Sequence, residues 1–334
     1  MTPRWSPFHL RLHKHLLHRP QLVPQGAPLL LAVSGGQDSM AMAGLLLDLQ
    51  RLHGWSLQLW HGDHGWRAES GQQARELANW AERQGLAITV ECWESGGAVS
   101  EASARAWRYG CLEREARRLG TAHVLTGHTA SDRAETLLLH LARGSHRRGL
   151  GSLQANRELA PGIALVRPLL GFSRADTAAI CRELELPIWE DSSNADLRFS
   201  RNRVRQEVMP VLEALHPGAS RRLAATAERL AAETEAEDEL LSLALRGLRV
   251  ESPAEGSRGA GNALNRQQLV EQSPPSQRRL LQQWCCNHSG QVLPSRQLEL
   301  LLQRLAKGQP PGVMHLAAGW QLRWDRSTLQ LQQR

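Results

Sequence analysis

The chain has 334 residues, which exceeds a typical single domain, so we expect a large core domain followed by a smaller one. Its hydrophobic fraction of 41% is spread along the chain, without the apolar run of roughly 18 residues that a membrane span requires. The net charge of +7 comes almost entirely from arginine, since Lys14 and Lys307 are the only lysines. Arginine suits phosphate and nucleic acid binding, but codon bias in a GC-rich genome explains the same composition.

The first half of the chain alternates short apolar runs with longer segments of helical spacing. The short runs predict strands at 29–33, 57–60, 87–92, 123–126 and 164–167. The longer segments predict helices at 40–52, 71–84, 101–119 and 132–142. This order is typical of a doubly wound α/β domain, in which helices cover a mostly parallel sheet.

The alternation fades after Pro168. Helices predicted at 174–184 and 201–215 lead to the breaker His216-Pro217-Gly218, so we place the domains at 1–216 and 217–334. In the second domain, 221–248 has the pattern of one long charged helix, and 251–261 that of a loop. The remainder predicts a smaller, mainly helical domain that ends in two short strands, near 314–316 and 321–324.

A glycine-rich segment, Ser34-Gly35-Gly36-Gln37-Asp38-Ser39, joins the first predicted strand to the first predicted helix. Two glycines let the backbone approach an anion, and the helix presents unpaired N–H groups and its positive dipole end to phosphate. Asp38 would repel phosphate unless a divalent cation lay between them, which predicts Mg²⁺ at this residue. For an isolated motif of this kind, a glycine turn that caps a helix is the alternative, and the Walker pattern is absent.

At this segment the chain resembles the PP-loop ATP pyrophosphatases. The resemblance implies that ATP binds at residues 34–39, is cleaved between its α and β phosphates, and adenylates a carbonyl oxygen. AMP and pyrophosphate would be the products.

Further motifs, in the same order, resemble those of the tRNA(Ile)-lysidine synthases over most of residues 29–216. Taken singly, each has an ordinary explanation as a cap, a turn or surface charge. The motifs are His61-Gly62-Asp63-His64-Gly65-Trp66-Arg67 with Ser70, Ala104-Arg105-Ala106-Trp107-Arg108-Tyr109, the segment from Thr126 to Thr136 with Arg143-Gly144, Arg167-Pro168-Leu169-Leu170, the segment from Glu190 to Asn194, and Arg201-Asn202-Arg203-Val204-Arg205.

Asp132 and Glu135 lie three residues apart at the start of a predicted helix, where first-turn acids often serve only as caps. The loop before them leaves the carboxyl end of a strand, where open α/β sheets bind ligands. The functional alternative is that they bind Mg²⁺ or the amine of a lysine substrate, with His128 near the nucleotide. The family usually has two consecutive acids, whereas the first of these positions is Ser131 here. We therefore assign the functional role of the acids to Asp132 and Glu135.

The resemblance implies a short form of the family, which ligates free L-lysine to C2 of the cytidine at the first anticodon position of a CAU-anticodon tRNA(Ile). The product, lysidine, would form through an adenylated intermediate, so that the tRNA reads AUA and is charged with isoleucine. A carboxyl-terminal domain that binds tRNA is expected, and a homodimer is left open. The implied catalytic residues are Asp38, Asp132, Glu135, Arg105 and Arg108, the implied ATP-binding residues are Ser34, Gly35, Gly36, Gln37, Asp38, Ser39 and His128, and the implied tRNA-binding residues are Arg143, Arg201, Arg203 and Arg205.

Three rival interpretations stay open. A PP-loop tRNA thiolation enzyme generally needs a cysteine pair or an iron–sulfur site, and the five cysteines include no C-x-x-C pair. An ammonia-dependent synthetase would not account for the arginines between 198 and 205. A non-catalytic RNA-binding relative would not need Asp38. The cysteine pattern and the lack of a secretory signal in residues 1–18 lead us to expect a cytoplasmic protein without a membrane partner.

Overall fold

The computed structural model describes residues 5–63, 70–93, 101–189, 196–250 and 263–333. They form two compact units, which divide after Ala231 inside helix α10 (Ala219–Leu248). The predicted domain boundary after residue 216 falls just before this helix and stays a prediction. Each unit is described by itself.

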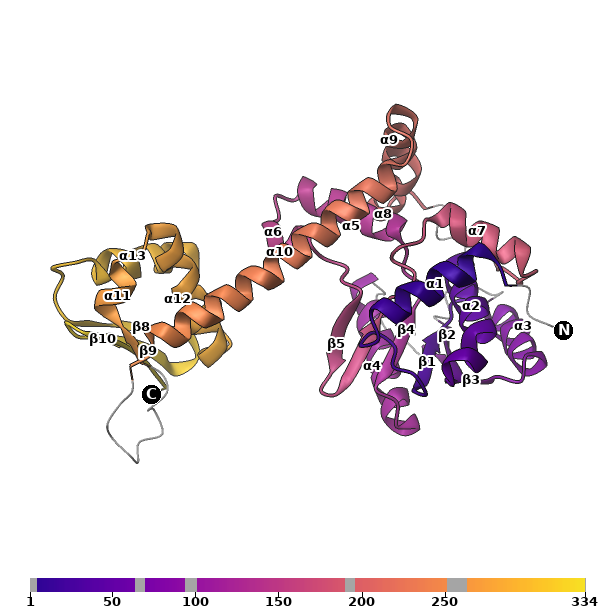
Figure 1. The fold of residues 1–334 in the computed structure, drawn as a ribbon, viewed down its shortest axis with the longest axis horizontal. Coiled ribbons are helices and arrows are strands. Elements are labelled where there is room, and N and C mark those ends of the chain that lie inside the picture. The colour runs from indigo at the N-terminus through magenta and orange to yellow at the C-terminus, as the bar shows by residue number, and fades with distance from the viewer. Residues whose placement is uncertain (1–4, 64–69, 94–100, 190–195, 251–262, 334) are drawn as a thin grey trace. The chain divides into compact units, whose positions relative to one another are not determined.

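The first unit is built on a six-stranded sheet in the order β3-β2-β1-β4-β6-β5 (Figure 1). All neighbouring strands are parallel except β5 and β6, which are antiparallel. The predicted doubly wound α/β fold is confirmed, and all five predicted strands are present. The strands are β1 (Pro28–Ala32), β2 (Ser56–Asp63), β3 (Ala87–Cys92), β4 (His123–Thr126), β5 (Asn156–Ala160) and β6 (Ile163–Val166).

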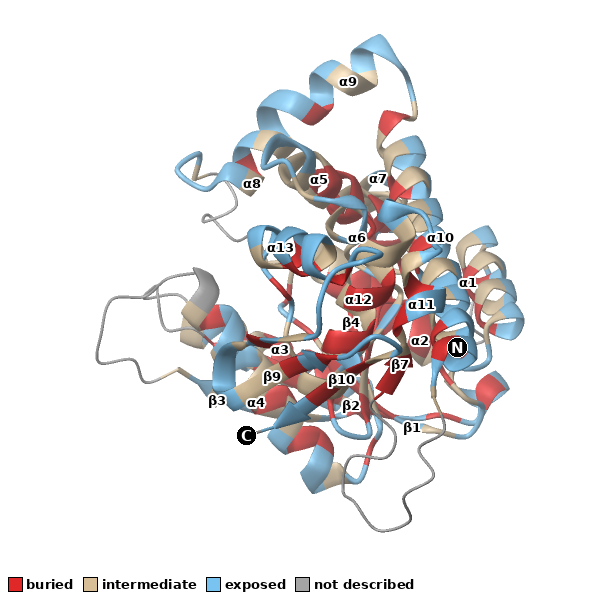
Figure 2. Ribbon diagram, turned by 90° about the vertical axis from the view of Figure 1, so that its left-hand side faces the viewer, coloured by how far each residue is buried: buried red, intermediate tan, exposed pale blue. Residues whose placement is uncertain are grey.

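Helices cover both faces of this sheet. Leu29 and Leu31 of β1 belong to a core with α1 and α2, whereas Leu30 between them packs in a second core with α4. Figure 2 shows the buried residues concentrated in the strands and in the helix faces against them. The helices are α1 (Pro7–His18), α2 (Gln37–His53), α3 (Ser70–Arg83), α4 (Glu101–Leu119), α5 (Ala130–Ala142), α6 (Arg147–Leu150) and α7 (Arg174–Glu183).

The single helix predicted at 201–215 is interrupted. The segment consists of α8 (Ser200–Arg203), a π-helical turn at Val204–Val208 and α9 (Met209–Leu215). Pro210 has no N–H to donate to the preceding turn, which accounts for the widened helix ahead of it. The wide turn carries Arg205, and such turns occur often at functional sites.

The second unit packs three helices and the end of α10 against a four-stranded antiparallel sheet in the order β7-β10-β9-β8. The predicted strand pair is present as β8 and β9, and β7 and β10 extend it, so this unit contains more sheet than predicted. Its remaining elements are β7 (Ala263–Asn265), α11 (Arg266–Val270), α12 (Pro274–Ser289), α13 (Ser295–Leu305), β8 (Gly312–His315), β9 (Trp320–Trp324) and β10 (Thr328–Gln333).

Candidate active site

The glycine-rich loop at 34–39 connects β1 to α2 and is closed by its own serines. Ser39 Oγ accepts a hydrogen bond from the Ser34 N–H over 3.1 Å and donates one to the Gly36 carbonyl over 2.8 Å. Gly35 has a φ of 83°, in the left-handed region that favours glycine, and a Cβ there would lie 3.1 Å from the Trp189 ring. The loop therefore needs glycine at residue 35, and it leads into the amino-terminal turn of α2.

Asp38 lies in the first turn of α2 and is held from α7. Thr177 Oγ1 donates to Asp38 Oδ1 over 2.5 Å, and Arg174 Nη1 lies 3.6 Å from Asp38 Oδ2. Burial and the nearby charge of Asp132 raise the pKa of Asp38, against the opposing effects of Thr177 and Arg174. A buried carboxylate with a raised pKa is characteristic of functional sites.

Gly127, just after β4, brings the third predicted motif against the glycine-rich loop. A Cβ on Gly127 would lie 2.8 Å from the Asp38 carbonyl oxygen and 2.8 Å from the Ser39 backbone N and Cα. These are backbone atoms, so rotation of a side chain would not relieve the contact. Glycine at this position is what lets the segment after β4 pack against the first turn of α2.

Asp132 and Glu135, in the first turns of α5, form a network with two arginines of the fifth motif. Arg201 reaches Asp132 Oδ1 at 2.9 Å and Glu135 Oε2 at 3.1 Å. Arg205 reaches Asp132 Oδ1 at 3.3 Å and Glu135 Oε1 at 2.8 Å. Burial alone raises the pKa of Asp132, but Arg201, together with His128, Thr129 and Arg205, lowers it overall. The predicted catalytic acids and two of the predicted tRNA-binding arginines are therefore partners of one another.

His128 follows Gly127 and borders this network. Burial lowers its pKa to about 3, with the charge of Asp132 opposing this effect and those of Arg167 and Arg201 adding to it. Its Nδ1 lies 2.9 Å from Thr126 Oγ1. At neutral pH the ring is uncharged and can act only through hydrogen bonds.

The other predicted residues lie around this centre. Arg105 and Arg108 are exposed on α4, and the Arg105 guanidinium lies 5.0 Å from the centroid of the Tyr109 ring. Arg143 caps the carboxyl end of α5, and Arg203 pairs with Glu207 at 2.9 Å. In the described ranges, neither Arg143 nor Arg203 forms an ion pair with Asp132 or Glu135.

Parts of two predicted motifs, residues 64–69 and 190–195, lie outside the described residues. His61 and Asp63 of the first motif are described and buried, and His61 Nδ1 lies 2.8 Å from the Val33 carbonyl oxygen. Across the described part of the chain, no three His, Cys, Asp or Glu side chains are grouped as a metal site. Mg²⁺ needs no such cluster, because it usually keeps waters and substrate phosphates as its other ligands. Among the described carboxylates, Asp38 is suited to be its single protein ligand.

The sequence interpretation missed the contribution of α7. Besides holding Asp38, Thr177 accepts a hydrogen bond from Gln37 Nε2 over 2.8 Å, and the Arg174 N–H donates to Ser131 Oγ over 3.1 Å. Ser131, where the family usually has an acid, thus links the starts of α5 and α7. The only sequence signal was Ser173 at a helix start, which predicts a cap rather than a site.

A strand, a glycine loop and a helix, with carboxylates at the carboxyl edge of a parallel sheet, define an ATP-using PP-loop domain. The PP-loop domain family model matches residues 10–212, and the model of the TilS substrate binding domain matches residues 264–330. The fold is also similar to that of the U34-tRNA thiolase NcsA from Methanococcus maripaludis, with a TM-score of 0.58 and 16% identity over 67% of this chain and 79% of that one. At that identity, the likeness supports the fold alone.

Two sequence relatives are more specific. A tRNA(Ile)-lysidine synthase from Parasynechococcus marenigrum is 50% identical over 98% of this chain and 95% of its own length. One from Prochlorococcus marinus is 40% identical over 98% of this chain and 96% of its own length. The chain belongs to the tRNA(Ile)-lysidine synthase family. The predictions of family, of ATP as co-substrate and of an ATP-dependent ligase that forms lysidine on tRNA(Ile) are confirmed.

No helix within the described residues is long and apolar enough to cross a membrane.

Proposed function

We propose that the chain ligates free L-lysine to C2 of the cytidine at the first anticodon position of a CAU-anticodon tRNA(Ile), with Mg-ATP as co-substrate. The observation that carries the assignment of residues is the packing of Gly127 against Asp38 and Ser39, which brings Asp132 near enough for its charge to act on Asp38, while Arg201 links Asp132 to Glu135. Family membership supports the reaction, and this geometry supports its location at the carboxyl edge of the sheet.

The loop side of the site suits the triphosphate. Gly35 and Gly36 leave the backbone accessible, and the amino-terminal turn of α2 favours negative charge. Asp38, fixed by Thr177 and Arg174, would be a protein ligand of Mg²⁺, which supplies charge neutralisation to the phosphates when bound. His128, as a neutral ring, would act as a hydrogen-bonding group toward the nucleotide.

The reaction requires two displacements. The cytosine C2 oxygen attacks the α-phosphorus and pyrophosphate leaves. The lysine ε-ammonium then loses a proton to solvent, the free amine attacks C2, and the bond from C2 to the adenylate oxygen breaks as AMP leaves. Asp132 keeps its charge because its pKa is lowered, so it suits binding of the lysine ammonium rather than removal of a proton. We assign Asp132 and Glu135 to that ammonium, which would replace part of their pairing with Arg201 and Arg205.

The tRNA side is supported by charge. Arg201 and Arg205, once partly released from the acids, would face the anticodon together with Arg203 and Arg143, and Arg105 and Arg108 flank the same edge from α4. The match to a substrate binding domain supports tRNA contact by residues 264–330. We expect the reaction to take place in the cytoplasm.

Lysine incorporation tests the proposal. Purified protein with Mg-ATP and radiolabelled lysine is expected to label a CAU-anticodon tRNA(Ile) transcript but not a methionine tRNA. Asp38→Asn is expected to reduce labelling and AMP release by about 100-fold or more, the usual cost of losing a charge-stabilising group. Because burial raises the pKa of Asp38, its charge opposes folding at neutral pH, so this variant should keep or gain stability.

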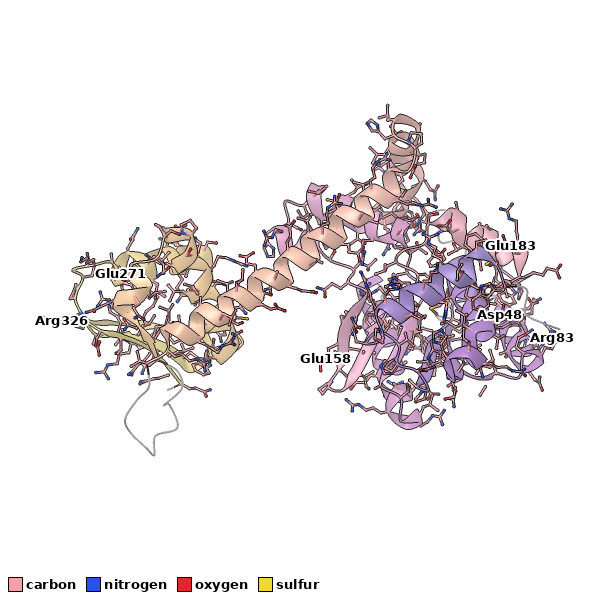
Figure 3. All side chains as sticks on the ribbon, viewed as in Figure 1. Asp48, Arg83, Glu158, Glu183, Glu271 and Arg326 are labelled. Carbon is pink, nitrogen blue, oxygen red and sulfur yellow. The ribbon has the colours of Figure 1, made fainter. Side chains whose placement is uncertain are left out.

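The matched control is Asp48→Asn on the same helix. Asp48, labelled in Figure 3, pairs with His9 at 2.9 Å and touches none of the site residues named above. It should label tRNA at the normal rate. Normal AMP release by a folded Asp38→Asn protein would remove the assignment of Asp38, and labelling of neither tRNA by the unmodified chain would refute the proposed substrate.

A further inference from the structure

A second group of arginines surrounds Tyr109, apart from the arginines that pair with Asp132 and Glu135. The guanidinium carbons of Arg105 and Arg157 lie 5.0 and 4.7 Å from the centroid of the Tyr109 ring. Arg167, directly after β6, is the third member. Burial alone raises the pKa of Tyr109, but the charge of Arg105, a hydrogen bond with Arg157 and the charges of Arg167 and Arg157 lower it overall. Residues from α4, β5 and the end of β6 thus converge on one phenol ring.

Arg167 is only partly satisfied by the protein. Its side chain is 2% exposed, its Nη1 donates to the Gln154 carbonyl over 2.6 Å, and its Nε is buried with no hydrogen-bond partner. Burial lowers the pKa of Arg167 to about 10, with Tyr109 opposing this effect and Arg157 and Arg105 adding to it. A buried donor without an acceptor is costly, so Arg167 is kept as a buried charge that its protein partners satisfy only in part.

The positive charge of this group is also uncompensated. Among the described residues, Arg105, Arg157 and Arg167 form no ion pair with a carboxylate, unlike Arg201 and Arg205. Glu158, labelled in Figure 3, adjoins Arg157 on β5, but successive strand side chains point to opposite faces. Three guanidinium groups beside one phenol therefore form a site for an oxyanion.

The location separates this site from the ATP phosphates. Arg167 follows β6 and Arg157 lies on β5, while the glycine-rich loop follows β1, two strands from β6 in the sheet order. With strands about 4.8 Å apart, the two sites are roughly 10 Å or more from each other along the edge. The charges of Arg167 and Arg105 act on the pKa of His128, after β4, which places the reacting centre between the two sites.

We propose that Arg105, Arg157 and Arg167, with Tyr109, bind a phosphodiester of the anticodon loop next to the reacting cytidine. This inference rests on the proposed function, which supplies the tRNA substrate. Arg105 is exposed and Arg157 is half-buried, so a polymer backbone can reach both, and the buried Arg167 would attract the same phosphate through its charge. Phosphate contacts fix the register of a nucleic acid, and here they would hold the cytosine over the α-phosphate.

The test compares two arginine variants on the first unit, at a half-buried and an exposed residue. Arg157→Gln removes a member of the site, and Arg117→Gln removes an α4 arginine that pairs with Glu113. Measured on the full chain, Arg157→Gln should weaken binding of a CAU-anticodon tRNA(Ile) transcript about 3- to 10-fold. It should also reduce the log–log salt slope of binding by about 1, with the KM for ATP and for lysine unchanged. Arg117→Gln should leave all four quantities unchanged.

Two results would overturn the inference. A raised KM for lysine with unchanged tRNA affinity would assign the site to the lysine carboxylate, and unchanged tRNA affinity and salt slope in a folded Arg105→Gln/Arg157→Gln double variant would reduce it to a structural cluster. The unmodified chain is assayed for lysine incorporation in the same preparation. Failure of that assay counts against the proposed function, whereas normal incorporation with unaltered tRNA binding by the double variant counts against this site alone.

Discussion

Two buried arginines, one in each unit of the chain, have opposite surroundings. Arg266 of the second unit is 4% exposed, and its guanidinium donates to the carbonyl oxygens of Leu305, Ala306, Gln309 and Asp325 at 2.5 to 3.3 Å. Arg167 of the first unit is 2% exposed, has one such carbonyl partner, and lies beside two further arginines. Burial of a guanidinium alone therefore does not reveal its role. The partners of Arg266 indicate a structural role, and the lack of a partner on Arg167 Nε is one basis of the binding site proposed above.

The largest expected effect separates these two residues. Arg266→Met leaves four backbone carbonyl groups without their donor and should destabilise the second unit by about 3 kcal/mol or more. Arg167→Met removes a partly satisfied charge and should cost the first unit about 1 kcal/mol while weakening tRNA binding. Native-state hydrogen exchange, read on β10 and on β6, measures each unit separately. Equal losses of stability in the two variants would contradict the different roles assigned to Arg266 and Arg167.

A smaller effect is expected where two loops of the first unit meet. Gly127→Ala places a methyl group 2.8 Å from the backbone of Asp38 and Ser39, which should cost about 2 kcal/mol of stability and raise the KM for ATP. Gly171→Ala is the control, since a Cβ there meets nothing within 4 Å. Urea unfolding and ATP titration measure the two effects. Equal behaviour of the two variants would show that the close approach at Gly127 is not required.

The smallest effect is a pH dependence of stability that is confined to the first unit. The pKa of folded His128 is about 3, so between about pH 6.5 and 3 the unfolded chain binds a proton that the folded chain does not. Stability from this group is complete above pH 6.5 and falls by at most about 1.4 kcal/mol per pH unit below it. His128→Asn should flatten the profile of the first unit between pH 6.5 and 5. An unchanged profile would contradict the neutral state assigned to this ring.

The parts of the fold that the sequence predicted are those set by local periodicity. The apolar runs of β1 and β4 and the helical spacing of α2 and α4 determine these elements almost residue by residue. Strand β5 was missed because it is a short edge strand whose polar and apolar residues give no run, and the turn at Pro210 was missed because only the helix geometry reveals it.

The predicted site residues stay a prediction, and the sequence did not indicate which of them pair with one another. The glycine-rich loop and the acids follow from motifs, whereas Arg201 pairs with Asp132 across 69 residues and Thr177 with Asp38 across 139. Such contacts depend on how the elements pack, which a single sequence does not specify. These contacts also distinguish Arg201 and Arg205, which pair with acids, from Arg105, Arg157 and Arg167, which form no ion pair among the described residues.

The most direct test of the account is a double-mutant cycle between Arg157 and the RNA backbone. Binding of the unmodified chain and of Arg157→Gln is measured for a CAU anticodon stem-loop with either a normal or an uncharged methylphosphonate linkage beside the reacting cytidine. The account predicts that the methylphosphonate weakens binding to the unmodified chain about 3- to 10-fold and has little further effect on Arg157→Gln. Independent, additive losses from the two changes at every linkage next to the cytidine would contradict it.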